Sequence, residues 1–265
     1  MEAGIIKLAP AFAGSNETTA GEMKEYMQAV AARFCEVTGL VLIETVDHER
    51  GAFFILGEEG KTHGLVAIGN SNYGSYHYRV IGVSGVGPDH DIRLGMNIQS
   101  NTNSYNGQGY TIASQDIWMK YIKTDHGIVI GLQSDTVPLA KTPTMIMQKI
   151  RIGDTEELAM LRIYSNSFYA SYTPMLSNEE KSTVLFTQSG CNRNIIPTEK
   201  EAMAEICLES RAELPGMRLY TNKKMAAVWN KVRIGGIQYI VASYGTANSA
   251  TFALLMQASD TAPQA

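Results

Sequence analysis

The 265-residue chain has few cysteines and few charges, with three cysteines and 18% charged residues. Cys35, Cys191 and Cys207 are odd in number and widely spaced, so they match neither a disulfide framework nor a zinc-binding pattern. Their pattern favours a reducing compartment. Lys and Arg form no basic run and the formal net charge is −4, so we expect no nucleic-acid partner.

Long apolar segments are also missing. No run approaches the roughly 20 residues of a membrane-spanning helix, and the N-terminus has no basic region followed by an apolar stretch, as a secretion signal would have. We therefore expect a soluble protein that is not exported and has no membrane partner. Hydrophobic residues make up 45% of the chain, which is enough for one large core or two modest ones.

One stretch has the pattern of a long helix. Thr19 and Glu22 fit a capping box, in which the two side chains satisfy free N–H groups of the first turn. Gly39 is a natural C-terminal stop. Residues 1–16, small and polar with one proline, are interpreted as an arm. The helix carries one apolar stripe at helical spacing: Met23, Tyr26, Met27, Val30, Phe34 and Val37.

Beyond residue 40 the apolar residues alternate with a period of two, and turn residues recur about every 8–12 positions. Gly153-Asp154 and Gly235-Gly236 predict two-residue hairpin turns, and Asp125–Gly127 predicts a third turn. A short second helix is expected at 198–211. Strands are expected at 40–46, 51–56, 64–68, 76–83, 92–98, 118–122, 128–132, 145–152, 158–164, 228–234 and 237–241. The prediction is a mainly β fold, with antiparallel sandwich or barrel-like modules and an N-terminal helix.

The chain divides by these patterns into an arm and helix at 1–39 and β modules at 40–150 and 151–265. Residues 99–111 and 164–173 are rich in Asn, Ser, Gly and Tyr, and we expect exposed loops there. Tyrosine contributes apolar area and a polar tip, which suits an interface. The candidate interface residues are Met23, Met27, Phe34, Tyr105, Tyr110, Phe168, Tyr169 and Tyr172.

Motifs that carry chemistry are incomplete. Gly57–Thr62 has two residues, where a phosphate loop has four, between its first glycine and Gly-Lys-Thr, so we interpret it as a turn. Ser84 lies in a near-match to a nucleophile elbow, but Val86 stands where glycine is required. The histidines form no i, i+4 pair and lie near no cysteine: His48, His63, His77, His90 and His126. We predict no catalytic residue, no cofactor and no metal site.

Strands and glycine turns follow one another in a particular order. Four groups of segments combine apolar strands and glycine turns. In order along the chain they are Gly51–Gly57 with His63–Gly69; Asp116–Tyr121 with Gly127–Gly131; Thr142–Pro143 with Ile150–Asp154; and Glu213–Tyr220 with Ile234–Val241 and Ala253–Met256. In order and spacing, these segments resemble a family of bacteriophage virion structural proteins of the tail and baseplate region. The resemblance implies a non-enzymatic subunit of the tail, baseplate or neck that contacts copies of itself and other virion proteins. It also implies localisation in the virion, after assembly in the cytoplasm of a bacterial host.

Two other function classes stay open. A carbohydrate- or receptor-binding module is compatible with aromatic residues beside amides at 99–111 and 164–173, although wet protein contacts have the same composition. A glycan hydrolase would need two carboxylates converging in a cleft, and adjacent pairs such as Glu58/Glu59 and Glu156/Glu157 point apart in a strand. The helix stripe is expected to pack within the subunit, but methionines tolerate imperfect surfaces and leave contact with a neighbouring subunit open.

Overall fold

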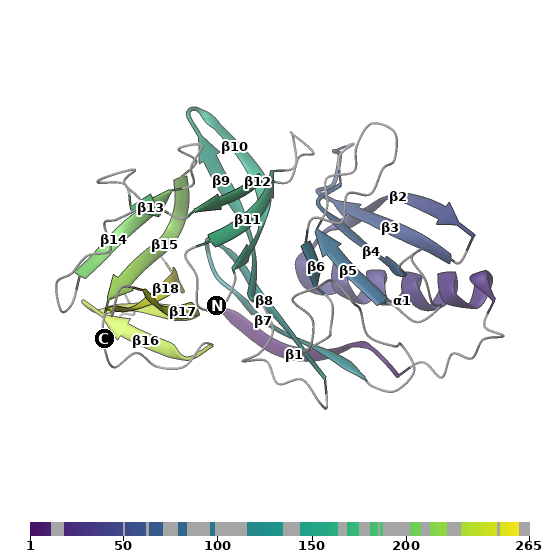
Figure 1. Cartoon of the computed structure of the whole chain (residues 1–265), viewed down its shortest axis with the longest axis horizontal. Helices are drawn as coiled ribbons and strands as arrows, with labels where there is room; N and C mark the ends of the chain where they lie inside the picture. The colour runs from purple at the N-terminus through teal and green to yellow at the C-terminus, as the bar shows by residue number, and fades with distance from the viewer. Residues whose placement is uncertain are drawn as a thin grey trace.

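The computed structural model describes residues 1–11, 19–49, 51–61, 64–70, 79–83, 96–98, 116–134, 144–163, 169–174, 181–184, 186–187, 202–207, 213–221, 229–247 and 250–259. Within these residues the fold is mainly β, with two antiparallel sheets and one helix near the N-terminus (Figure 1). The predicted fold class is confirmed.

The larger sheet contains thirteen of the described strands. Its main path runs β1-β7-β8-β9-β15-β18-β17-β16, and the pairs along it are antiparallel. β10, β11 and β12 extend from β9, and β14 and β13 extend from β15. The bounds are β1 (Glu2–Ala9), β7 (Ile117–Lys123), β8 (Gly127–Ser134), β9 (Thr144–Ile152), β10 (Thr155–Ile163), β11 (Tyr169–Pro174), β12 (Lys181–Val184), β13 (Phe186–Thr187), β14 (Ala202–Cys207), β15 (Glu213–Thr221), β16 (Lys231–Ile234), β17 (Ile237–Ala247) and β18 (Ala250–Gln257).

This sheet curls until two of its distant parts meet. Lys120 on β7, near one end of the strand path, places its Nζ 5.5 Å from the centroid of the Trp229 ring, just before β16 at the other end. Trp229 continues the pairing with β17, since its N–H donates to the carbonyl of Val241 over 2.7 Å. The right-handed twist of successive strands accounts for such closure, which makes the sheet barrel-like.

The smaller sheet has five strands in sequence order: β2 (Val41–His48), β3 (Gly51–Gly57), β4 (Val66–Asn70), β5 (Arg79–Val83) and β6 (Met96–Ile98). Every residue of β3 is buried, so both faces of this sheet are covered at its centre. Phe54 and Leu56 face the helix, whereas Phe53 and Ile55 point to the opposite face. Figure 1 shows the helix lying along one face of the sheet.

The helix α1 (Ala20–Thr38) begins and ends as the sequence predicts. Thr19 and Glu22 form the capping box, and the bond from the Thr19 backbone N–H to the Glu22 carboxylate, 2.8 Å long, lowers the pKa of Glu22. Gly39 has a φ of +73° and closes the last turn with an N–H bond to the Cys35 carbonyl. Glycine adopts this left-handed conformation without a steric penalty, so the helix stops there.

One core joins the helix, the smaller sheet and one face of the larger sheet. Along with α1, it contains Phe54 and Leu56 from the smaller sheet, and Met119 and Met147 from the larger one. A second core, between β15, β17 and β18, contains Tyr220, Tyr239 and Leu255. The boundary expected near residue 150 falls inside β9, which pairs with β10 beyond it. The division into modules at 40–150 and 151–265 stays a prediction about folding units.

The hairpin predictions are confirmed. Strands β9 and β10 meet at Gly153-Asp154, β16 and β17 at Gly235-Gly236, and β7 and β8 at the turn before Gly127. Gly235 and Gly236 both have positive φ, +57° and +84°, as the primed hairpin turns require.

Three sequence predictions are wrong where the structure describes them. The helix expected at 198–211 is strand β14 over Ala202–Cys207, paired with β13 and β15. Sheet pairing outweighs the helix preference of this Ala- and Glu-rich segment, since propensity is a weak prior beside tertiary context. The arm expected at 1–16 contains strand β1, and the loop expected at 164–173 contains the start of strand β11.

Candidate functional site

The helix stripe proposed as an interface lies in the core of its own subunit. Met23, Met27 and Phe34 are 3%, 0% and 0% exposed, and α1 packs on β3, β4 and β1. The structure therefore agrees with the expectation that the stripe packs within its own subunit. It leaves these three side chains almost no exposed surface to offer to a neighbour.

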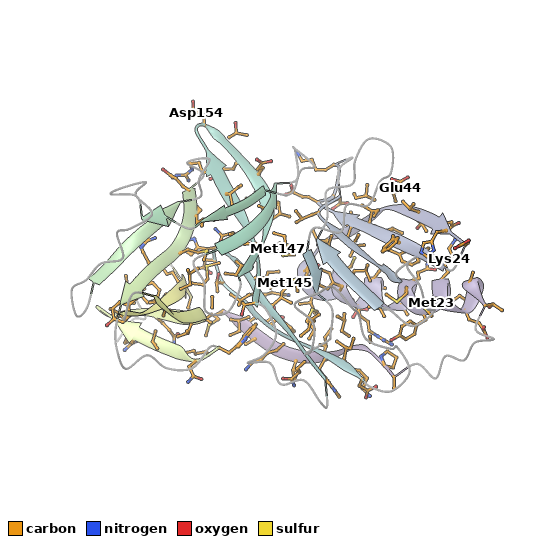
Figure 2. The ribbon with its side chains drawn as sticks, viewed as in Figure 1. Met23, Lys24, Glu44, Met145, Met147 and Asp154 are labelled. Atoms are coloured by element: carbon orange, nitrogen blue, oxygen red, sulfur yellow. The ribbon has the colours of Figure 1, made fainter. Side chains whose placement is uncertain are left out.

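Methionine is prominent in the core where the helix meets the larger sheet. Met145 and Met147 on β9 belong to the same buried cluster as Met23 on the helix (Figure 2). Methionine is unbranched and flexible, and it fills irregular gaps where elements of different geometry meet. Met23, which we considered for contact between subunits, thus belongs to a core that the helix shares with both sheets.

The aromatic candidates divide into two groups. Tyr169 and Tyr172 lie on strand β11, opposite Val184 and Lys181 of β12. Tyr105, Tyr110 and Phe168 lie outside the described residues. The glycan-binding alternative depends on 99–111, which also lies outside them, so it stays a prediction.

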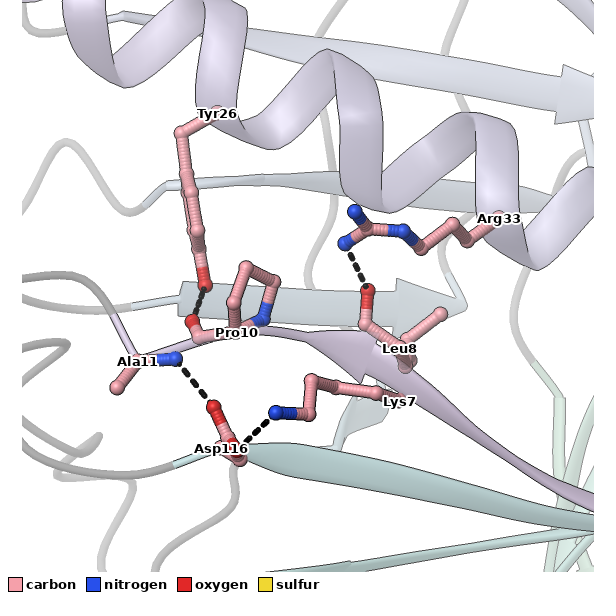
Figure 3. A network of polar contacts seen from close by, with 7 residues as sticks. All are labelled: Lys7, Leu8, Pro10, Ala11, Tyr26, Arg33 and Asp116. Carbon is pink, nitrogen blue, oxygen red and sulfur yellow. Dashed lines mark hydrogen bonds and ion pairs between the residues drawn. The ribbon is translucent and has the colours of Figure 1, made fainter.

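A polar network fastens the C-terminal half of β1 between the helix and β7 (Figure 3). Asp116 accepts a hydrogen bond from the Ala11 backbone N–H over 2.7 Å and forms an ion pair with Lys7. From the helix, the Tyr26 hydroxyl donates to the Pro10 carbonyl over 2.7 Å, and Arg33 donates to the Leu8 carbonyl over 3.3 Å. These bonds satisfy carbonyl and N–H groups that a strand end would leave unpaired.

We expect Asp116→Ala to loosen this end of β1. The change removes both the partner of Lys7 and the acceptor of the Ala11 N–H, so amide hydrogen exchange of β1 should accelerate about fivefold, for a loss near 1 kcal/mol. The control is Asp47→Ala, which removes the 2.7 Å ion pair between Lys24 and Asp47, away from β1. Equal exchange of β1 in both variants would contradict the role of Asp116.

The N-terminal half of β1 is open. Glu2, Ala3, Ile5 and Lys7 are exposed, and β1 is the last strand of the main path, with β7 as its only strand partner in the described structure. Glu2 is held by Lys123 at 3.2 Å and by the Tyr121 hydroxyl at 3.2 Å, both from β7. The sequence interpretation missed this strand because its apolar signal is short, consisting of Ile5, Ile6 and Leu8 among small residues.

Gln148 on β9 is a buried polar side chain whose amide lacks hydrogen bonds. It is 1% exposed, and neither its nitrogen nor its oxygen has a hydrogen-bond partner in the structure. It lies opposite Gly127, where an added Cβ would come within 2.7 Å of the Cβ of Gln148. Burying an unpaired amide costs free energy, because its bonds to water are not replaced.

Gln148→Met is expected to stabilise the protein. Methionine has a similar length and no amide, so the free energy of unfolding should rise by about 1–3 kcal/mol. Chemical denaturation measures it. The control is Gln257→Met, because the Gln257 amide donates to the Ser259 carbonyl over 3.0 Å and its loss brings no gain. A Gln148→Met variant less stable than the unmodified chain would contradict the assignment.

Within the described residues, charged side chains such as Arg151 form ion pairs that contribute to the structure. Arg151 lies 3.0 Å from Glu156 and 3.4 Å from Glu213, and these bonds, that to Glu156 foremost, raise the pKa of its guanidinium. Burial raises the pKa of the half-buried Cys35 thiol, the direction opposite to that of an activated cysteine. No cluster of three or more His, Cys, Asp or Glu side chains suited to a metal ion occurs among the residues described.

No helix in the described part of the chain is long and apolar enough to cross a membrane. Comparison with known proteins adds no assignment: no family model, no curated protein and no solved structure matches this chain.

Proposed function

We propose that this chain is a non-enzymatic structural subunit of a bacteriophage or phage-tail-like particle, placed in the tail, baseplate or neck and assembling as a symmetric oligomer. The proposal starts from the sequence resemblance to virion structural proteins. The geometry that supports it best is the open N-terminal half of β1, an exposed edge that ends a thirteen-stranded sheet.

An exposed strand edge favours assembly for a physical reason. Its outward N–H and C=O groups are unpaired within the sheet and can pair with a strand of another chain. Soluble proteins usually protect such edges with charge, proline or a covering element. The edge of β1 carries two charges, Glu2 and Lys7, each held in an ion pair, and between them Ile5 is 51% exposed. A buried core shared by the helix and both sheets joins these elements, which suits a rigid building block.

Two measurements test this function. Native mass spectrometry of the purified chain should show one discrete oligomer, and electron microscopy should show its rotational symmetry. Proteomics of particles purified from a host lysate should find the chain at a fixed ratio to other virion proteins. A chain that is monomeric at all concentrations and absent from the particles would refute the proposal.

A further inference from the structure

Trp229, directly before β16, has an unusual backbone conformation. Among the non-glycine residues that the structure describes, it is the one with a positive φ, +75°. Its N–H donates to the Val241 carbonyl over 2.7 Å, and the Val241 N–H donates to the Asn230 carbonyl over 3.0 Å. Two residues of one strand thus oppose one residue of the other, which is the pattern of a β-bulge whose left-handed position is normally a glycine.

A tryptophan in this position is strained. In the left-handed region the Cβ atom lies too close to the following carbonyl oxygen. Gly235 and Gly236, in the turn after β16, adopt positive φ without this penalty because they have no Cβ. A strained conformation at a residue with a side chain persists only where the surrounding structure enforces it.

Burial of the Trp229 ring offsets the strain. Trp229 is 7% exposed, and the Nζ of Lys120 on β7 lies 5.5 Å from the ring centroid, within the range of a cation–π attraction. In the described pairing, β16 bonds to β17, whereas β7 bonds to β1 and β8. The ring therefore connects two parts of the sheet that backbone pairing does not connect.

The strand that follows Trp229 is short and half-exposed. β16 has four residues, and β17 is its strand partner in the described sheet. Lys231 and Arg233 are exposed, and Val232 and Ile234 are only partly buried. Segments with few buried side chains open at a lower free energy than the core does. Strand β3, by contrast, is buried throughout.

We propose that Trp229 is a releasable latch of the curled sheet. In the closed state, the buried ring on β7 holds β16 in place and maintains the strained bulge. In the open state, the ring leaves Lys120, the Trp229 backbone relaxes to negative φ, and β16 separates from β7 while α1 and its core stay folded. The strain favours release, since it is present only in the closed state. The latch is a property of the fold and does not depend on the proposed function.

Fluorescence tests release directly, because the chain has two tryptophans, Trp118 and Trp229. In Trp118→Phe, the emission of Trp229 should shift to the red at a lower urea concentration than the one at which the far-UV circular dichroism of the chain is lost. In the matched variant Trp229→Phe, the emission of Trp118 on β7 should change together with the circular dichroism. Non-coincident transitions are the signature of a step before global unfolding.

Hydrogen exchange of the full chain tests the strain. Trp229→Ala removes the ring and keeps the left-handed penalty, so the β16 amides should exchange at least about tenfold faster. Trp229→Gly removes both, and its β16 amides should exchange about fivefold more slowly than those of Trp229→Ala. The matched control is Val232, opposite Tyr239 on the same strand, where the glycine variant should exchange faster than the alanine variant.

A change at Lys120 tests the contact with β7. Lys120→Met removes the ammonium group and keeps most of the stem, so exchange of the β16 amides should accelerate about threefold. In the Trp229→Gly background the same change should have no effect on β16, because the ring is absent. The control is Lys149→Met, at an exposed lysine of β9, which should leave β16 unchanged. Amides of α1 should exchange at the same rate in all these variants.

Three results would overturn the inference. They are coincident transitions of Trp229 emission and circular dichroism in Trp118→Phe, faster exchange of β16 in Trp229→Gly than in Trp229→Ala, and unchanged exchange of β16 in Lys120→Met. The fluorescence measurement keeps Trp229 in place, so it decides between a latch and a single global transition even if the alanine and glycine variants fail to fold.

Discussion

Phe34→Ala is expected to lower the free energy of unfolding by about 3–5 kcal/mol, since truncating a buried phenylalanine removes transfer free energy and leaves a cavity. Phe34 is 0% exposed and lies in the core shared by α1 and both sheets. For a chain of this size the melting temperature should fall by roughly 6–20 °C. Gln28→Ala, an exposed change on the same helix, is the control and should have little effect.

The same variant distinguishes packing of the helix stripe within its own subunit from packing of the stripe against a neighbouring subunit. If Phe34 packs on its own β3 and β4, the loss caused by Phe34→Ala is the same at low and high protein concentration. If the stripe contacts a neighbour, the loss grows with concentration, because association adds to stability only in the intact stripe. Denaturation at two concentrations a hundredfold apart distinguishes the cases, and the structure leads us to expect no difference.

Local signals predicted the parts of the fold that local physics determines. The helix bounds follow from Thr19, Glu22 and Gly39, whose side-chain or backbone chemistry acts within one turn. The hairpin at Gly235-Gly236 follows from the positive φ that only such residues adopt cheaply. These features need no knowledge of the remaining chain.

The missed elements depend on distant partners. Strand β14 is Ala- and Glu-rich, and only its pairing with β13 and β15 makes it a strand. Strand β1 pairs with β7, more than a hundred residues later, so its short apolar signal has no local hairpin to support it. Sequence reasoning that reads turns between neighbouring strands finds hairpins and overlooks such long-range pairs.

The candidate interface shows the same limit. Met23, Met27 and Phe34 are an apolar stripe whether a neighbour or the chain's own sheet covers them, and the sequence pattern is identical in both cases. Ile5 escaped notice because exposure, rather than composition, distinguishes it: half of its surface is accessible on an edge strand. An exposed apolar edge can be identified only once the strand order is known.

A steric contact between β15 and the β7–β8 turn underlies the other large effect. Gly216 has a φ of +73°, and a Cβ added there would lie 2.2 Å from Cδ2 and 2.4 Å from Cγ of His126. Cγ is bonded directly to the Cβ of His126, so relieving the clash requires the whole imidazole ring to move rather than the end of a flexible side chain. Thr124 also anchors the turn, since its Oγ1 accepts from the N–H groups of His126 and Gly127 over 3.2 and 3.1 Å.

Gly216→Ala should therefore lower the free energy of unfolding by about 2–5 kcal/mol, the sum of a left-handed backbone penalty near 1–2 kcal/mol and an overpacking penalty of about 1–3 kcal/mol. Gly153→Ala isolates the first penalty, because Gly153 has a φ of +59° and no atom within 4 Å of its added Cβ. The second penalty depends on the imidazole ring, so His126→Ala combined with Gly216→Ala should cost less than the sum of the single changes. Chemical denaturation of the four variants measures this coupling, and strict additivity would show that the ring of His126 does not explain the requirement for glycine at position 216.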